Sequence, residues 1–149
     1  MADACCSNLK DSKIKVEENG QKAIFLNPDR QAYKKVRVDG CLIKNTTACD
    51  YWVVRVDEDS VLVELKGTDV DHAIEQIEAT FEYLAKDKKR TKNMAALIVC
   101  RKPSRHPSFT SKLQKAKSRI LSRHKAPLHI VTGAHEFAME NILRITGPF

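Results

Sequence analysis

The sequence predicts a mixed α/β (α+β) domain, with a central mixed sheet of four to five strands that is flanked by helices and preceded by an N-terminal hairpin. Two observations lead to this fold class. The chain has 149 residues, which is the size of one compact domain with its own core. Three strand-like segments are followed by a helix, a strand, a helix and a strand, and no repeat or low-complexity linker interrupts that order. We therefore expect one domain over residues 13–149 and no fixed structure for residues 1–12.

Turn signals separate short elements in the first half of the chain. Asn19-Gly20 lies between two apolar-containing segments and is a strong signal for a β-hairpin. Asn27-Pro28 is typical of a helix N-terminus. Gly40 interrupts an alternating segment, as in a strand with a bend. The expected elements are hairpin strands over 13–17 and 22–26, a short helix from Asn27 to about Lys35, and strands over 36–43, 50–56 and 61–66.

Longer periodic patterns follow in the second half. Thr68, with Asp71 three residues later, is typical of a helix start, and apolar residues then recur at helical spacing. Met94–Cys100 is a continuous apolar run, the pattern of a buried central strand. Pro127 ends a second amphipathic segment. The expected elements are a long helix that begins at Thr68, a strand over 94–100, a helix over 111–125 and a strand over 128–132.

Composition indicates a soluble globular protein of the cytoplasm. Hydrophobic residues make up 42% of the chain and charged residues 30%, which is typical of that class. The longest uncharged apolar run, Met94–Cys100, is too short to cross a bilayer. The first residues include acids and no apolar stretch, so they do not resemble a secretory signal. Five cysteines, an odd number without an export signal, predict reduced thiols in a cytoplasmic protein, and their spacing does not suit zinc.

Positive charge is concentrated in one part of the chain. The net charge is +7, yet residues 88–135 carry 13 Lys or Arg and no Asp or Glu. A block of this kind attracts a polyanion, and nucleic acid is the usual one. The segment 101–112 combines Pro, Ser and basic residues and is expected to leave the sheet near one edge. The residues expected to contact the phosphate backbone are Lys102, Arg105, Lys115 and Arg119.

Three ionisable residues lie in the apolar hairpin of residues 49–67. Glu64 and Lys66 share a face because side chains alternate along a strand. If Val56 faces Ser60 across a three-residue loop, Asp50 lies on that face as well, diagonal to Glu64; a slip of one residue would turn Asp50 to the opposite face. In the first register the two carboxylates lie close enough to bind one cation. Mg²⁺ or Mn²⁺ suits such oxygen ligands, and a neighbouring lysine can help to deprotonate an attacking water.

The pattern Asp50…Glu64-Leu65-Lys66, followed by a long helix, a buried strand and a basic helix, resembles the PD-(D/E)XK (restriction-endonuclease-like) nuclease superfamily. The resemblance implies a restriction-endonuclease-like core and a Mg²⁺- or Mn²⁺-dependent endonuclease that hydrolyses phosphodiester bonds, in DNA rather than RNA. It implies that Asp50, Glu64 and the carbonyl of Leu65 bind the metal and that Lys66 is the catalytic lysine. Gln76 matches a glutamine found on the following helix in the RecB-like branch.

The resemblance covers residues 36–132 and has two departures. Where the RecB-like branch carries Tyr, four residues after the glutamine, this chain has Thr80. Many members also carry an acid on a helix before the first strand. Asp29 is the only acid on the short helix expected here, and the role stays open among Asp29, Glu17, Glu18 and Asp39.

Two other function classes remain open from the sequence. One is a non-catalytic nucleic-acid-binding or assembly module on the same fold, because fold alone does not decide activity. The other is an interaction protein whose hairpin charges are ordinary surface, which requires the slipped register with Asp50 turned away. Small nuclease domains often work in pairs or in larger assemblies, so we expect a homodimer or a part of a larger assembly.

Overall fold

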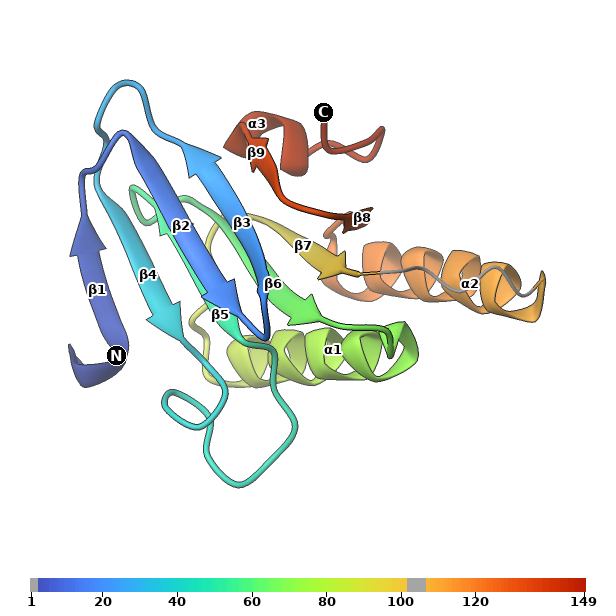
Figure 1. Cartoon of the computed structure of the whole chain (residues 1–149). Coiled ribbons are helices and arrows are strands. Elements are labelled where there is room, and N and C mark those ends of the chain that lie inside the picture. Colours follow the sequence, from blue (N-terminus) through green and yellow to red (C-terminus); the bar gives the residue numbers. More distant parts are fainter. Residues whose placement is uncertain (1–2, 102–106) are drawn as a thin grey trace.

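The computed structural model describes residues 3–101 and 107–149 (Figure 1). In chain order, the elements are η1 (Asp3–Cys5), β1 (Cys6–Leu9), β2 (Lys13–Glu18), β3 (Gln21–Leu26), β4 (Tyr33–Arg37), β5 (Tyr51–Arg55), β6 (Asp59–Lys66), α1 (Val70–Lys86), β7 (Asn93–Cys100), α2 (Pro107–His124), β8 (Leu128–Thr132), β9 (His135–Phe137) and α3 (Met139–Ile142). A six-stranded sheet has the order β1-β4-β5-β6-β7-β8, and a three-stranded sheet has the order β2-β3-β9.

The large sheet is mixed. Strands β1, β4, β5 and β6 pair antiparallel, whereas β6, β7 and β8 pair parallel. Parallel neighbours need a long crossover, and α1 and α2 supply the two crossovers. Both helices therefore begin near the C-terminal ends of β6 and β7, and both run back to the opposite ends of these strands.

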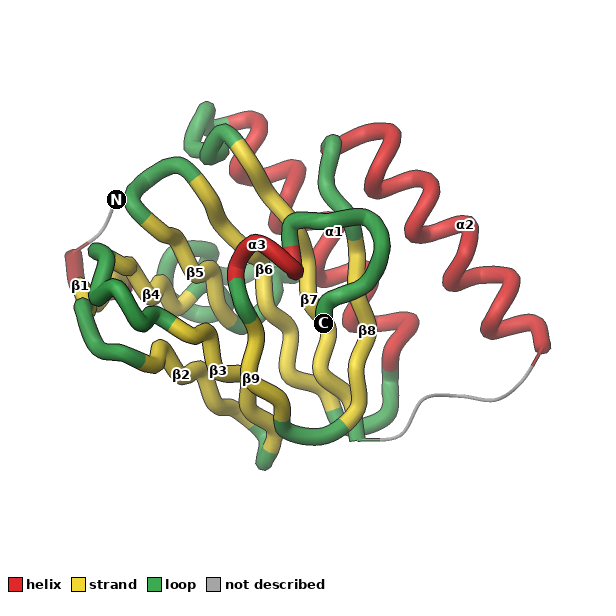
Figure 2. Tube along the Cα trace, turned by 90° about the horizontal axis from the view of Figure 1, so that it is seen from above, coloured by secondary structure: helices red, strands yellow, loops and turns green. Residues whose placement is uncertain are grey.

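The elements form three layers, and one hydrophobic core lies on each face of the large sheet (Figure 2). Helices α1 and α2 pack on one face of the large sheet, where Ile77 and Phe81 of α1 meet Trp52 and Leu62. The small sheet and α3 cover the other face, where Phe25 and Phe137 belong to the second core. Because both faces are covered, β6 and β7 are almost entirely buried, which explains their continuous apolar sequences.

Most of the expected elements are confirmed. The N-terminal hairpin, the β5–β6 hairpin, both long helices and the strands β7 and β8 lie where their patterns predict them. The start of α1 differs slightly, because its N-cap is Asp69, whose Oδ1 accepts the backbone N–H of His72 at 3.0 Å. Thr68 is exposed just before the cap. The structure confirms a mixed α/β domain.

The flanking layers differ from the prediction. We expected a sheet of four to five strands between helices, and the structure has six strands with helices α1 and α2 on one face only. The predicted hairpin belongs to a second sheet, in which β3 pairs parallel with β9, a strand that the sequence did not indicate. This parallel pair joins residues more than 100 positions apart in the chain, so no local pattern could reveal it.

The short helix predicted for residues 27–35 is wrong. Asn27 instead closes a turn, in which its Oδ1 accepts the N–H of Gln31 and its Nδ2 donates to the carbonyls of Gln31 and Asp11. The strand β4 then begins at Tyr33, pairs on both sides with β1 and β5, and ends at Arg37, well before residue 43. Two ladders of backbone hydrogen bonds outweigh the weak local signal of a helix start.

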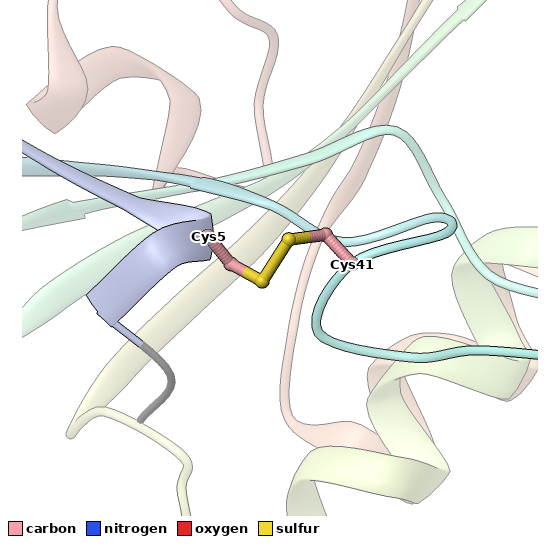
Figure 3. The surroundings of a disulfide bond; sticks show 2 residues. All are labelled: Cys5 and Cys41. Carbon is pink, nitrogen blue, oxygen red and sulfur yellow. A yellow bond between two sulfur atoms is a disulfide. The ribbon is translucent and has the colours of Figure 1, made fainter.

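The N-terminal residues are ordered rather than unstructured. Cys6–Leu9 forms the edge strand β1 against β4. Cys5, just before it, is joined to Cys41 by a disulfide whose two residues are 36 positions apart (Figure 3). The expectation that all five cysteines are reduced thiols is therefore wrong; Cys6, Cys49 and Cys100 are the free ones. The disulfide ties the N-terminus to the loop that leads from β4 to Asp50.

The β5–β6 hairpin has the predicted three-residue loop, moved by one position. Arg55 faces Asp59 across the loop, instead of Val56 facing Ser60. Val56 leaves the ladder because its N–H donates to the carbonyl of Ala32 at 2.9 Å. The predicted face is nevertheless confirmed, because moving both partners by one residue preserves the alternation of side chains.

No helix in the described part of the chain is long and apolar enough to span a bilayer.

Candidate functional site

Strand β5 ends before β6 does, and two carboxylates occupy the resulting gap. Tyr51 is the first residue of β5 in the ladder, whereas β6 continues to Lys66 beside β7. The N–H of Asp50 donates to Glu64 Oε1 at 3.0 Å, and Asp50 Oδ2 accepts the N–H of Leu65 at 2.9 Å. Side-chain oxygens thus replace the carbonyl oxygens of a continued ladder. This exchange brings Asp50 and Glu64 to one point at the end of β6.

Both carboxyl groups hold their protons more strongly than usual. The side chain of Glu64 is 1% exposed, and burial together with the Asp50 carboxylate raises the pKa of Glu64 to about 8, although Lys66 opposes this shift. Burial also raises the pKa of Asp50, and the charges of Glu18 and Asp39 add to the effect. Two carboxylates so placed favour a retained proton unless a cation joins them.

Lys66 lies on the same face and is held by the first helix. Its Nζ donates to Gln76 Oε1 at 2.9 Å and lies 3.6 Å from Glu64 Oε2. Gln76 in turn donates from Nε2 to the carbonyl of Ala48 at 3.1 Å. The structure therefore brings Asp50, Glu64, Lys66 and Gln76 together, as the sequence predicted. Gln76 orients the ammonium group of Lys66 and also ties α1 to the segment before Asp50.

Thr80 strengthens the same connection from one turn further along α1. Its fully buried hydroxyl donates to the carbonyl of Gln76 at 2.8 Å and accepts the N–H of Cys49 at 2.9 Å. A tyrosine at this position could not occupy the same enclosed space. Thr80 therefore anchors the backbone beside Asp50 rather than contributing an aromatic ring to the site.

The tip of the β2–β3 hairpin reaches the site from the second sheet. Asn19 Nδ2 donates to the carbonyl of Leu65, the residue after Glu64, at 3.2 Å. Of the acids considered for an upstream role, Glu18 and Asp39 act on Asp50 electrostatically. Asp29 does not lie on a helix; it is exposed in the turn after β3. The role of upstream acid is therefore better suited to Glu18 or Asp39.

The donor atoms at this point suit a hard divalent cation. Two carboxylates and the Leu65 carbonyl offer oxygen, the ligand type that Mg²⁺ and Mn²⁺ prefer. Each carboxylate uses one oxygen for a backbone N–H, which leaves Asp50 Oδ1 and Glu64 Oε2 without a backbone donor, although Lys66 Nζ lies 3.6 Å from Glu64 Oε2. Within residues 3–101 and 107–149, no three His, Cys, Asp or Glu side chains are grouped as metal ligands. A cation would therefore depend on water or phosphate oxygens for its remaining ligands, as Mg²⁺ commonly does.

Of the four predicted phosphate-binding residues, the two that the structure describes, Lys115 and Arg119, line one hollow. Lys102 and Arg105 lie outside the described residues. Lys115 is exposed on α2 and lines a hollow of about 330 Å³ between α1 and α2. Arg119 lines the same hollow, but its guanidinium donates two hydrogen bonds to Glu78, at 2.8 and 2.5 Å. A phosphate would have to compete with that carboxylate for Arg119.

The basic block itself is divided between two ends of the molecule. Residues 88–92 follow the C-terminus of α1, and Arg90 Nη2 donates to the carbonyl of His124 at the C-terminus of α2. Helix α1 begins beside the carboxylate pair, and its 17 residues make it about 25 Å long. The lysines of residues 88–92 therefore lie at the end of the helix layer that is distant from the carboxylates.

One basic residue near the site was missed by the sequence analysis. Arg37, the last residue of β4, pairs with Tyr51, which directly follows Asp50. The misplaced strand over 36–43 concealed this pairing, since Arg37 then fell near the start of the strand.

No family model, curated protein or solved structure matches this chain.

Proposed function

We propose that the protein is a metal-dependent nuclease that hydrolyses phosphodiester bonds in nucleic acid, with DNA as the expected substrate. The observation that carries the proposal is the geometry at the end of β6. A buried and a half-buried carboxyl group, both with raised pKa values, lie beside a lysine that a glutamine orients. Strongly perturbed acids with a defined charged partner are more common at functional sites than elsewhere.

Each residue at the site has a chemical task in this proposal. Asp50, Glu64 and the Leu65 carbonyl would bind Mg²⁺ or Mn²⁺, which polarises the phosphate and lowers the pKa of a bound water. Lys66 positions that water and assists removal of its proton, or offsets the charge that develops on the phosphate. Gln76 restricts Lys66 to the orientation that this task requires.

The arrangement of elements supports the same proposal. The three antiparallel strands β4, β5 and β6 are followed by α1 and the parallel strand β7. The candidate residues lie at the start of β5, the end of β6 and the second turn of α1. This order is consistent with the restriction-endonuclease-like core that the motif implies, although β1, β8 and the small sheet are additional.

Cleavage assays test the proposal directly. The substrates are labelled plasmid, single-stranded DNA and RNA, each with Mg²⁺, with Mn²⁺ and with EDTA. We expect metal-dependent cutting that falls by about 10²–10⁴-fold in Lys66→Ala, the range typical for loss of a general acid or base. Glu64→Ala should also abolish cutting, because it removes a metal ligand.

Two exposed residues on α1 provide matched controls. Lys86→Ala and Glu75→Ala remove the same charges away from the carboxylate pair, and both should cut like wild type. Circular dichroism verifies that every variant is folded. Cutting by Lys66→Ala at the wild-type rate would contradict the assignment of the lysine. Absence of cutting in all forms, with salt-sensitive binding retained, would favour the non-catalytic binding module.

A further inference from the structure

Arg37 presents its guanidinium on the side of the second sheet, at the end of the strands where the carboxylate pair lies. Its Nη1 lies 3.3 Å from Glu18 Oε2 and 3.3 Å from Tyr51 Oη. The backbone connects this group to the site, because the N–H of Val38 donates to the carbonyl of Asp50 at 2.9 Å. Asn19, which follows Glu18, donates to the carbonyl of Leu65, so Arg37 lies at the same end of the strands as the carboxylate pair, while Glu64 and Lys66 point toward α1.

The guanidinium is held in place without being buried. It lies over the ring of Tyr51, with its central carbon 5.9 Å from the ring centroid. The Tyr51 hydroxyl donates to the carbonyl of Glu17 at 3.4 Å, which fixes the ring against the β2–β3 hairpin. The Arg37 side chain is still 53% exposed. A planar guanidinium that is ordered but accessible is suited to two hydrogen bonds with a phosphate.

The carboxylate that Arg37 now contacts is easy to replace. Glu18 is 30% exposed, and only one N–O contact, at 3.3 Å, joins the two groups. Ion pairs at the surface contribute little to stability, so a phosphate can exchange with Glu18 at small cost. By contrast, Arg119 is held by two shorter hydrogen bonds to Glu78.

We propose that Arg37 binds a phosphate of the nucleic acid strand beside the scissile bond, in exchange for Glu18. The inference rests on the proposed function and adds to it the residue that holds the substrate at the site. Glu18 then acts as a competing anion, which keeps Arg37 oriented when no substrate is bound. A purely structural Arg37–Glu18 pair predicts something different, because loss of either partner would then have the same effect.

Binding measurements in EDTA, where a metal-dependent nuclease does not cut, test the proposal. Fluorescence anisotropy of a labelled oligonucleotide is measured over a range of salt concentrations. We expect Arg37→Ala to weaken binding by about tenfold and to lower the slope of log affinity against log salt by about 0.9, the value for one lost phosphate contact. Arg37→Lys keeps the charge but not the paired hydrogen bonds, so its affinity should be intermediate.

The decisive variant is Glu18→Gln, for which the two explanations predict opposite signs. Removal of a competing anion should strengthen binding several-fold, with thermal stability close to that of wild type. Arg30→Ala, which removes an exposed arginine between β3 and β4 and outside the basic block of residues 88–135, is the control and should bind like wild type.

The proposal is overturned if Arg37→Ala binds like Arg30→Ala, or if Glu18→Gln and Arg37→Ala weaken binding equally. Because binding is measured without metal, its outcome is independent of the cleavage assay. If the wild-type protein binds in this pattern but never cuts, the proposed Arg37 contact stands and only the proposed nuclease activity is contradicted.

Discussion

Both ends of the β5–β6 hairpin carry partly buried charges, but these charges are neutralised by neighbouring groups to different degrees. At the turn, Arg55 Nη2 lies 2.7 Å from Asp59 Oδ2 and also contacts Glu140, with the side chains of Arg55 and Asp59 only 14% and 16% exposed. Asn93 Nδ2 donates to the other oxygen of Asp59 at 2.9 Å. Every charge at the turn therefore has an opposite charge or a hydrogen-bond donor.

At the open end, about 17 Å further along β6, the compensation is weaker, because the nearest cation, Lys66 Nζ, lies 3.6 Å from Glu64 Oε2. Two carboxylates face each other there, and the ammonium group of Lys66 donates to the amide of Gln76. The pKa values show the contrast. Burial alone would raise the pKa of Asp59, but hydrogen bonds from Arg55 and Asn93 hold it below its ordinary value, whereas the pKa of Glu64 is raised. The turn has the electrostatics of a structural ion pair, whereas the two carboxyl groups at the open end hold a proton more strongly than usual.

The largest expected effect concerns the covalent support of the open end. The Cys5–Cys41 disulfide closes a long loop and restrains the segment that leads to Asp50. Under oxidising conditions, Cys5→Ser should lower the free energy of unfolding by up to about 4 kcal/mol, the chain-entropy value for a loop of this length. Urea denaturation measures the change. Cys6→Ser, which leaves the disulfide intact, is the matched control, and equal stability of the two variants would contradict the prediction.

The second prediction compares the two ends directly. Asp59→Asn should cost up to about 3 kcal/mol of stability, because it leaves the largely buried Arg55 with only the exposed Glu140 as a charged partner. Glu64→Gln should cost nothing, or should stabilise the metal-free protein at pH 9, because the amide removes a charge that burial disfavours. Both variants replace a carboxylate by the matching amide. Equal losses of stability, measured by urea denaturation, would mean that the two ends do not differ as described.

The third prediction uses the raised pKa of Glu64. Since its folded value is about 8 and its ordinary value is 4.5, the folded state retains a proton that the unfolded state loses between these limits. This contribution to stability is fully present below about pH 4.5 and is lost as the pH rises toward 8. Metal-free wild type should therefore lose stability over this window more steeply than Glu64→Gln.

Addition of Mg²⁺ should reverse that trend, because the cation binds the ionised carboxylates. Stabilisation by Mg²⁺ should be larger at pH 9 than at pH 6 and should reach about 2.7 kcal/mol when the metal concentration is a hundred times its dissociation constant. Thermal denaturation with Mg²⁺ or EDTA measures it, with Glu64→Gln as the control. Equal stabilisation of the wild type and this variant would place the metal elsewhere.

The sequence predicted the strands and helices whose patterns are repeated over many residues. Ile74, Ile77 and Phe81 recur at helical spacing because one stripe of α1 packs on the sheet. Alternation alone placed Glu64 and Lys66 on one face, whereas the side of Asp50 depends on the parity of the register, which the sequence left open. The helix expected after Asn27 failed, since its signal was one capping dipeptide without any periodic apolar face.

The sequence by itself thus determined the elements whose apolar pattern repeats over many residues, and the identity of the residues at the end of β6. Only the tertiary structure decided what surrounds them: the β1 edge strand, the Cys5–Cys41 disulfide, the Asn19 contact to Leu65 and the place of Arg37 beside Tyr51. These features join segments that are distant in the chain, and local propensities of a few tenths of a kcal/mol do not encode such pairings. Burial of Glu64 and its raised pKa likewise arise from layers that only the complete fold brings together.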